Sequence, residues 1–162
     1  MTTTVAPKEG LSWLFREKFT FKELPNAQSF DGYFKSLLIC VNGDDQLTSQ
    51  EREWVVGYAA AYGASDSLIE ELKSYAASED IDQIVSQNKV SDSSRRYLIY
   101  DAIQACGADG EYSEPEQATV IKMAAKLGIP ERVVNEIESI YLEEAKLREK
   151  RLAFMYPSGT PI

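Results

Sequence analysis

Histidine is absent from the 162-residue chain, and cysteine occurs only twice, as Cys40 and Cys106. Without histidine the chain cannot form Ser–His or Cys–His catalytic pairs or histidine-ligated zinc and haem sites, and it lacks the commonest general base. Two cysteines cannot build a thiolate-rich zinc or iron–sulfur site. We therefore expect no catalytic residues of these classes, and we interpret both thiols as reduced side chains of the core.

Long apolar runs and recognisable targeting patterns are missing as well. No stretch approaches the roughly 18 apolar residues of a transmembrane helix, and residues 1–10 lack the apolar segment of a signal peptide. The glycine-rich phosphate loops and the G-x-S-x-G nucleophile pattern do not occur, so no organic cofactor is expected. The sequence predicts one cytoplasmic domain over residues 1–162, with flexible tails at 1–10 and 157–162.

Basic charge is scarce, because 17 Lys and Arg against 26 Asp and Glu give a net charge of −9. The imbalance is concentrated in residues 30–94, where 12 acidic and 4 basic side chains give −8. An acidic body repels phosphate backbones, so we expect no nucleic-acid partner. The same charge suits a cation or a basic protein partner, or serves only to keep the protein in solution.

The chain does contain an internal repeat. A shift of 65 residues aligns residues 37–75 with residues 102–140 without a gap. The two copies extend over about residues 30–77 and 95–142. The identical pairs include Asp44/Asp109, Glu51/Glu116, Val55/Val120, Ala59/Ala124, Gly63/Gly128 and Glu71/Glu136. A repeat of this length predicts two similar structural units.

Each copy reads as helix, acidic turn, helix, glycine and helix. Thr48 with Glu51, and Ser113 with Glu116, have the spacing of capping boxes, in which a hydroxyl and a carboxylate satisfy the first backbone N–H groups of a helix. Apolar residues recur at helical spacing, and β-branched alternation is missing. The predicted fold is all-α, a compact bundle of about seven helices in which two similar repeats are related by pseudo-two-fold symmetry.

The acidic turns are the one constellation that carries chemistry. Oxygen ligands gathered near one turn suit calcium, magnesium or manganese rather than zinc. The alternative is that these carboxylates only cap helices and solvate loops. An EF-hand is excluded, because in a loop whose first position is Asp109 the sixth and twelfth positions are Glu114 and Val120 instead of Gly and Glu. The candidate metal ligands are Asp44, Asp45 and Glu51 in the first copy and Asp109, Glu111 and Glu116 in the second.

Three other groups have weaker signals. Trp13, Trp54, Tyr58 and Tyr62 lie at helical spacings and are expected in the core. Arg95 and Arg96 open a helix, where cations are slightly unfavourable, so they are either surface residues or contacts for an anion or a partner. The basic cluster at 146–151 is either a solvated helix face or a docking site for a partner.

The segment from Ala108 to Glu116, Ala-Asp-Gly-Glu followed by Ser-x-x-Glu, precedes an alanine-rich helix that ends in Leu127-Gly128. Over about residues 30–145 this pattern resembles the TerB-like family of tellurite-resistance proteins, and the fold is similar to a domain of certain DnaJ-type co-chaperones. The resemblance implies a metal-binding role for Asp109 and Glu116, and by the repeat for Asp44 and Glu51. The first copy departs from the pattern at Asp45 and Gln46, which stand where the second has Gly110 and Glu111.

The resemblance also implies a non-catalytic protein of tellurite resistance and chemical stress, acting with other proteins of a stress-response or membrane-associated complex. Three hypotheses remain open. The first is a domain that binds a divalent ion, and the second is a metal-free interaction scaffold that uses its acidic face or basic last helix. The third is a metal-dependent hydrolase, since acidic sites can activate water.

Overall fold

The computed structural model describes residues 8–162, which form nine α-helices and one 3₁₀ turn and no strand. The all-α prediction is therefore confirmed, but these residues form nine helices instead of about seven, because the connection between the repeats contains two short helices, at 81–86 and 89–93. Most of the predicted tail at 1–10 lies outside the described residues. The elements are α1 (Lys8–Phe19), α2 (Ala27–Val41), α3 (Ser49–Ala61), α4 (Asp66–Ser74), α5 (Ile81–Ser86), α6 (Lys89–Ser93), α7 (Arg95–Cys106), η1 (Gly107–Asp109), α8 (Glu114–Lys126) and α9 (Glu131–Met155).

Helices α2 and α7, the first helices of the two repeats, pack against each other at the centre of the bundle. Their facing side chains are fully buried, and Leu37, Leu38, Leu98, Ile99 and Ile103 have no exposed surface. Cys40 and Cys106 are buried in the same layer as free thiols, as predicted. The apolar stripe of each helix therefore forms the core, and the turn that follows each helix is carried to the edge of that core.

Helix boundaries repeat at the offset of 65 residues. Helix α3 and helix α8 occupy equivalent positions, and α4 and α9 begin at the equivalent residues Asp66 and Glu131. Gly63 and Gly128 end the second helix of each copy with φ of 85° and 75°. This left-handed conformation strains any residue with a Cβ, which explains glycine at both positions.

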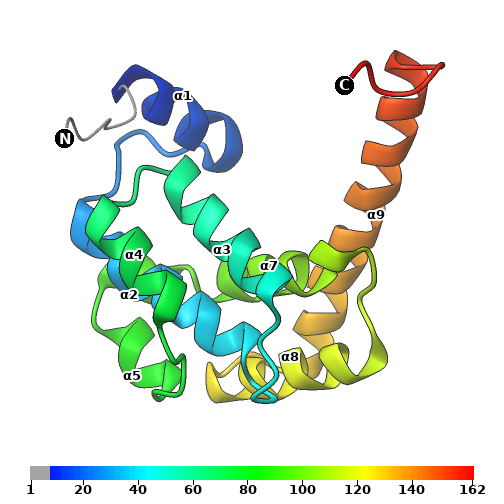
Figure 1. The fold of residues 1–162 in the computed structure, drawn as a ribbon. Helices are drawn as coiled ribbons and strands as arrows, with labels where there is room; N and C mark the ends of the chain where they lie inside the picture. Colours follow the sequence, from blue (N-terminus) through cyan, green and yellow to red (C-terminus); the bar gives the residue numbers. More distant parts are fainter. Residues whose placement is uncertain (1–7) are drawn as a thin grey trace.

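Helix α1 lies across the C-terminal end of α3 (Figure 1) and is held by aromatic side chains. Phe15 is its one buried residue and meets the Tyr62 ring edge-on, with centroids 5.2 Å apart. The helix ends at Phe19, because Thr20 turns left-handed with φ of 57°. The predicted burial of Trp13 is wrong: its side chain points to solvent and is 56% exposed.

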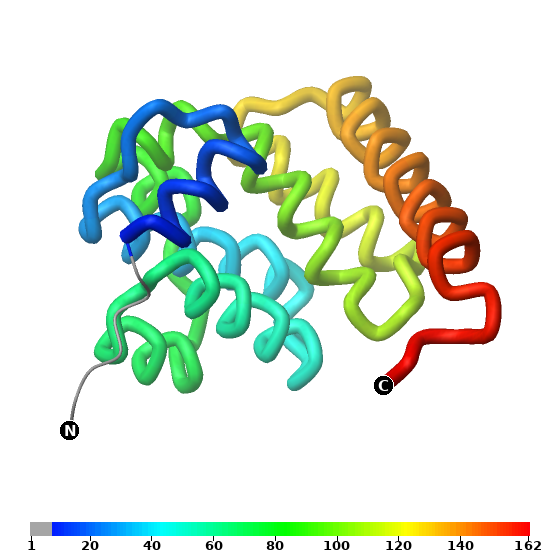
Figure 2. The backbone as a smooth tube through the Cα atoms, turned by 90° about the horizontal axis from the view of Figure 1, so that it is seen from above, coloured from blue at the N-terminus to red at the C-terminus, as the bar shows by residue number. Residues whose placement is uncertain are grey.

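Helix α9 is long, and only its beginning belongs to the core. Val133, Val134 and Ile137 are buried, whereas Leu147 is 62% exposed and Phe154 is 80% exposed. Figures 1 and 2 show the second half of α9 running away from the other helices. The helix ends at Met155.

Candidate functional site

The first acidic turn joins α2 to α3 and is closed by its own side chains. The Asn42 amide oxygen accepts a hydrogen bond from the Leu47 backbone N–H at 3.2 Å, and Asp44 Oδ1 accepts from the Gln46 N–H at 3.0 Å. Asp45 adopts a left-handed conformation with φ of 58°. The side chain of Asp44 is thus fixed by one oxygen while its other oxygen stays free of hydrogen bonds from residues 8–162.

The second acidic turn has the same construction. Asp109 Oδ1 accepts a hydrogen bond from the Glu111 N–H at 3.1 Å. Asp44 accepts the equivalent bond from the Gln46 N–H, which also lies two residues farther along the chain. Gly110 is left-handed with φ of 95°. Asp45, which replaces this glycine in the first copy, is left-handed as well, so the substitution leaves the form of the turn unchanged. Aspartate is one of the few residues with a side chain that tolerate this conformation.

Both predicted capping boxes are present. Glu51 Oε2 accepts from the Thr48 N–H at 2.8 Å, and Glu116 Oε2 accepts from the Ser113 N–H at 3.1 Å. The reciprocal bonds from each glutamate N–H to the capping hydroxyl are 3.2 Å and 3.4 Å long. Glu51 is only 7% exposed, so its carboxylate is held beneath the turn instead of in solvent.

Each acidic turn packs against the other repeat. The Lys122 ammonium of α8 donates to the Gly43 carbonyl of the first turn at 3.3 Å, while η1 of the second turn packs against α3. Gly43 leaves no room for a side chain, because a Cβ there would lie 2.7 Å from Thr119 Cγ2 and from Met123 Cγ. This reciprocal packing brings the two turns together.

Four carboxylates therefore share one region. Burial raises the pKa of Glu51; hydrogen bonds from Thr48 oppose the shift, and the charges of Asp44 and Asp109 add to it. Burial also raises the pKa of Glu116, and the charges of Asp109, Glu51 and Asp44 raise it further. We call Asp44, Glu51, Asp109 and Glu116 the acidic group. Its members repel one another across the boundary between the two repeats.

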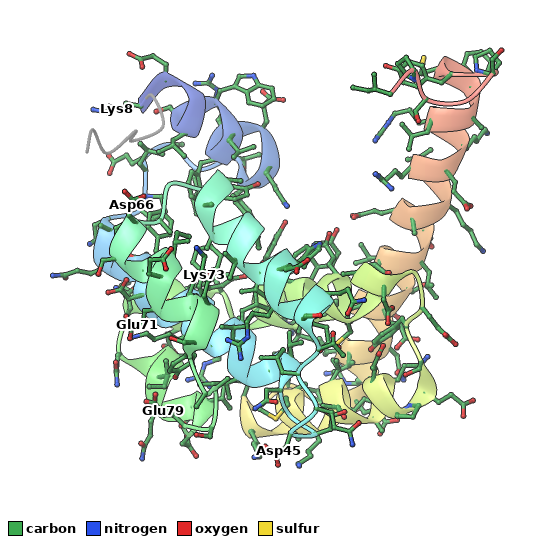
Figure 3. All side chains as sticks on the ribbon, in the orientation of Figure 1. Lys8, Asp45, Asp66, Glu71, Lys73 and Glu79 are labelled. Atoms are coloured by element: carbon green, nitrogen blue, oxygen red, sulfur yellow. The ribbon has the colours of Figure 1, made fainter. Side chains whose placement is uncertain are left out.

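No member of the acidic group forms an ion pair with residues 8–162. The four ion pairs of this part of the chain lie elsewhere: Lys35–Glu71, Lys73–Glu70, Arg95–Asp82 and Arg95–Asp92. The two remaining candidates, Asp45 and Glu111, are exposed at the rim, and Figure 3 shows Asp45 at the outer edge of the molecule. As the side chains stand, no three acidic or thiol groups of the described chain are close enough together to hold an ion.

The fold of this chain also occurs in a solved structure of another protein. The structure of a tellurite resistance protein from Nostoc punctiforme matches this one with a TM-score of 0.91. The two sequences are 36% identical, and the match covers 96% of this chain and 97% of that chain. The chain belongs to the TerB-like family. No family model matches the sequence, and no curated protein does.

A second polar centre of this TerB-like chain lies around Asp101 and was not predicted from the sequence. Asp101 of α7 has no exposed surface, and the Tyr33 hydroxyl donates to its carboxylate at 2.5 Å. The Gln104 amide donates to the other oxygen at 3.1 Å, and the Tyr58 hydroxyl faces the same carboxylate. Burial raises the pKa of Asp101 to about 6, although these hydrogen bonds and the charge of Lys18 lower it. The available signal was a lone aspartate among apolar residues in the middle of a helix.

The two thiols of this TerB-like protein are poor ligands and poor reductants. Burial raises the pKa of both Cys40 and Cys106, and the charges of Glu51, Glu116 and Asp44 raise that of Cys106 further. A protonated thiol is a weak nucleophile and does not bind metal. Over residues 8–162, no helix combines the length and the apolar character that crossing a bilayer requires.

Proposed function

We propose that this TerB-like protein acts in tellurite resistance and chemical stress as a non-catalytic cytoplasmic domain that binds a divalent cation between its two acidic turns. One observation carries the proposal: the charges of Asp44 and Asp109, one from each repeat, raise the pKa values of Glu51 and Glu116, and none of the four carboxylates forms an ion pair with residues 8–162. A cation bound there would remove this repulsion, and its binding energy would tie the two repeats together.

The donor set fits a hard cation. In the acidic group, one oxygen of every carboxylate accepts a hydrogen bond from a backbone N–H. The second oxygen of each carboxylate accepts no hydrogen bond from residues 8–162. Carboxylate oxygens are the ligands of calcium, magnesium and manganese, and the absence of histidine disfavours zinc. Because Asp44 and Asp109 are exposed, their free oxygens are open to an ion from solvent. The pseudo-two-fold relation expected of the repeats would make the two turns equal contributors.

A non-catalytic role is supported by the chemistry of the chain. Reduction of tellurite requires an electron donor, and the two thiols are buried with raised pKa values. We therefore propose that this chain, like the tellurite resistance protein of Nostoc punctiforme, contributes to resistance, and that it does so by binding and assembly.

Thermal unfolding of chelator-stripped protein, titrated with calcium, magnesium, manganese and zinc, tests the proposal. One ion at a hundred times its dissociation constant should stabilise the fold by ~2.7 kcal/mol. Asp44→Asn and Asp109→Asn should abolish the effect, because asparagine keeps the hydrogen bond of the turn but removes the charged ligand. Asp45→Asn is the matched control, since it removes the same charge one residue away and should leave binding intact. Flat curves for all four ions would refute metal binding.

A second candidate function rests on the exposed half of α9. Leu147, Phe154 and Met155 are exposed there beside the basic cluster at 146–151. A scaffold that docks a partner through this segment would lose tellurite resistance when residues 147–162 are removed, with metal titrations unchanged. If resistance instead follows the acidic group, Asp109→Asn abolishes it and the truncation does not.

A further inference from the structure

A cavity of about 560 Å³ lies at the opposite end of α2, α3 and α7 from the acidic turns. It is bounded by α1, the N-terminal halves of α2 and α7, the C-terminal end of α3, and α6. Helix α3 has 13 residues and so separates the two regions by about 20 Å. The cavity is therefore a feature distinct from the candidate metal site.

The walls of the cavity are mainly aromatic. Pockets for small organic molecules have this size and this predominance of apolar and aromatic side chains. The rings support one another edge-on, with 4.8 Å between the centroids of Tyr58 and Tyr62 and 4.9 Å between those of Phe19 and Tyr97. The aromatic lining consists of Phe15, Phe19, Phe21, Phe30, Tyr33, Phe34, Tyr58, Tyr62 and Tyr97.

The charges of the lining have one sign. Lys18 and Arg96 line the cavity, and no aspartate or glutamate does so among the described residues. Neither cation forms an ion pair with residues 8–162, whereas the adjacent Arg95 pairs with both Asp82 and Asp92. Asp101, whose pKa the charge of Lys18 lowers, lies behind Tyr33 and Tyr58, fully buried and already hydrogen-bonded.

The position of Lys18 argues against a cationic ligand in the aromatic lining. Its ammonium lies 4.9 Å from the centroid of the Tyr58 ring and 5.5 Å from that of Tyr62. The protein thus already supplies the cation that these ring faces attract. The cavity therefore combines an apolar volume with two cations, Lys18 and Arg96, that form no ion pair with residues 8–162.

We propose that this cavity binds an amphipathic carboxylic acid, with the carboxylate between Lys18 and Arg96 and the apolar body among the phenyl and phenol rings. Aromatic acids and fatty acids share this chemistry, and the two can be distinguished by measurement.

The test is calorimetric titration of the full chain, in the presence of a chelator, with 2-naphthoate and with decanoate. Each acid is compared with the neutral alcohol and the primary amine of the same apolar body. We expect the carboxylate to bind about tenfold more tightly than the alcohol, the gain typical of a charge-assisted hydrogen bond. Tighter binding of naphthoate identifies aromatic acids as the ligand class, and tighter binding of decanoate identifies fatty acids.

Lys18→Gln and Arg96→Gln should each weaken binding of the carboxylate about tenfold and leave binding of the alcohol unchanged. Both side chains are exposed, so the fold should tolerate the changes. Arg16→Gln is the matched control, because Arg16 is also exposed on α1 but does not line the cavity. The Asp109→Asn variant should bind the acid as the wild type does, which separates this proposal from metal binding.

Three results would overturn the proposal. One is the lack of saturable carboxylate binding up to about 1 mM, the weak limit of specific recognition. Another is tighter binding of the amine than of the acid. The third is carboxylate affinity that does not respond to removal of Lys18 or Arg96.

Discussion

Asp101 is an aspartate that the fold removes completely from solvent. A carboxylate without exposed surface is stable only when hydrogen bonds replace its hydration, and Tyr33 and Gln104 supply such bonds. Burial still outweighs them, because the pKa of Asp101 rises to about 6. Its side chain connects α7 to α2 and lies behind the aromatic wall of the cavity.

The stability of the protein should therefore carry a pH-dependent contribution from Asp101. An unfolded aspartate has a pKa of about 3.9, so between this value and about 6 the folded state holds a proton that the unfolded state has lost. The contribution is fully present below about pH 4 and falls as pH rises through this window, by roughly 2–3 kcal/mol in total. Asp101→Asn should lack this dependence.

Urea unfolding of both proteins from pH 4 to pH 7 provides the measurement. Glu51 and Glu116 also have raised pKa values, but they are present in both proteins, so their effect cancels in the difference. A difference in unfolding free energy that stays constant over this range would show that Asp101 titrates normally.

Replacing either of two glycines by alanine should change the stability of the protein, in opposite directions. A Cβ at Gly43 would lie 2.7 Å from Thr119 Cγ2 and Met123 Cγ, so Gly43→Ala should destabilise the protein by roughly 1–2 kcal/mol. Gly57 is exposed inside α3 with nothing within 4 Å of its missing Cβ, so Gly57→Ala should stabilise by about 0.5–1 kcal/mol. Denaturant midpoints of the two variants check both signs, and equal shifts would contradict the close packing of Gly43 on α8.

At the scale of elements, the second helix of each repeat is specified by local sequence. Thr48 and Ser113 begin α3 and α8 with complete capping boxes, and Gly63 and Gly128 follow the helix ends with positive φ. These signals act within four residues of the chain, so they could be predicted without knowledge of the fold.

The capping hydroxyls should contribute measurably to stability. Thr48→Ala and Ser113→Ala each remove a bond to the third N–H of a helix and should destabilise by about 1 kcal/mol. Ser49→Ala is the control, since Ser49 is exposed and its hydroxyl contacts only Gln50, at 3.4 Å. Chemical denaturation measures all three, and a control as destabilised as the cap variants would contradict the role of the boxes.

The elements that sequence reasoning described poorly are those that depend on distant contacts. Helices α5 and α6 have six and five residues, too few for a helical pattern, and they form against α2. Trp13 has helical spacing, but the orientation of α1 is set by Phe15 against Tyr62, which turns Trp13 to solvent. The residues of the acidic group could be predicted from the repeat, whereas the convergence of the two turns arises only from helix packing.

At the scale of the whole molecule, the structure divides into a packed body and a projecting helix. The last buried side chain of α9 is Ile137, and the Tyr100 hydroxyl donates to Glu144 one to two turns farther on. Beyond Lys146 the only half-buried side chain is Leu152. The body therefore depends little on the last residues of the chain.

A chain that ends after Lys146 should unfold with nearly the same free energy as the full chain, within about 0.5 kcal/mol, the range of surface changes. A second truncation after Asn135 removes Ile137 and Tyr141 from the body and should destabilise by several kcal/mol. Thermal unfolding of both fragments beside the full chain gives the comparison. A large loss in the first truncation would show that the projecting half of α9 supports the body.

The seating of each acidic turn on the helix of the opposite repeat has a consequence for the chain as a whole. Residues that meet in this reciprocal manner are the mark of an isologous contact between identical subunits. In the pseudo-two-fold arrangement that we propose for the repeats, both subunits would be parts of one polypeptide, joined by the α5–α6 connection. Neither half provides the surface on which its own turn rests, so a chain cut at this connection should fold only when its two pieces recombine.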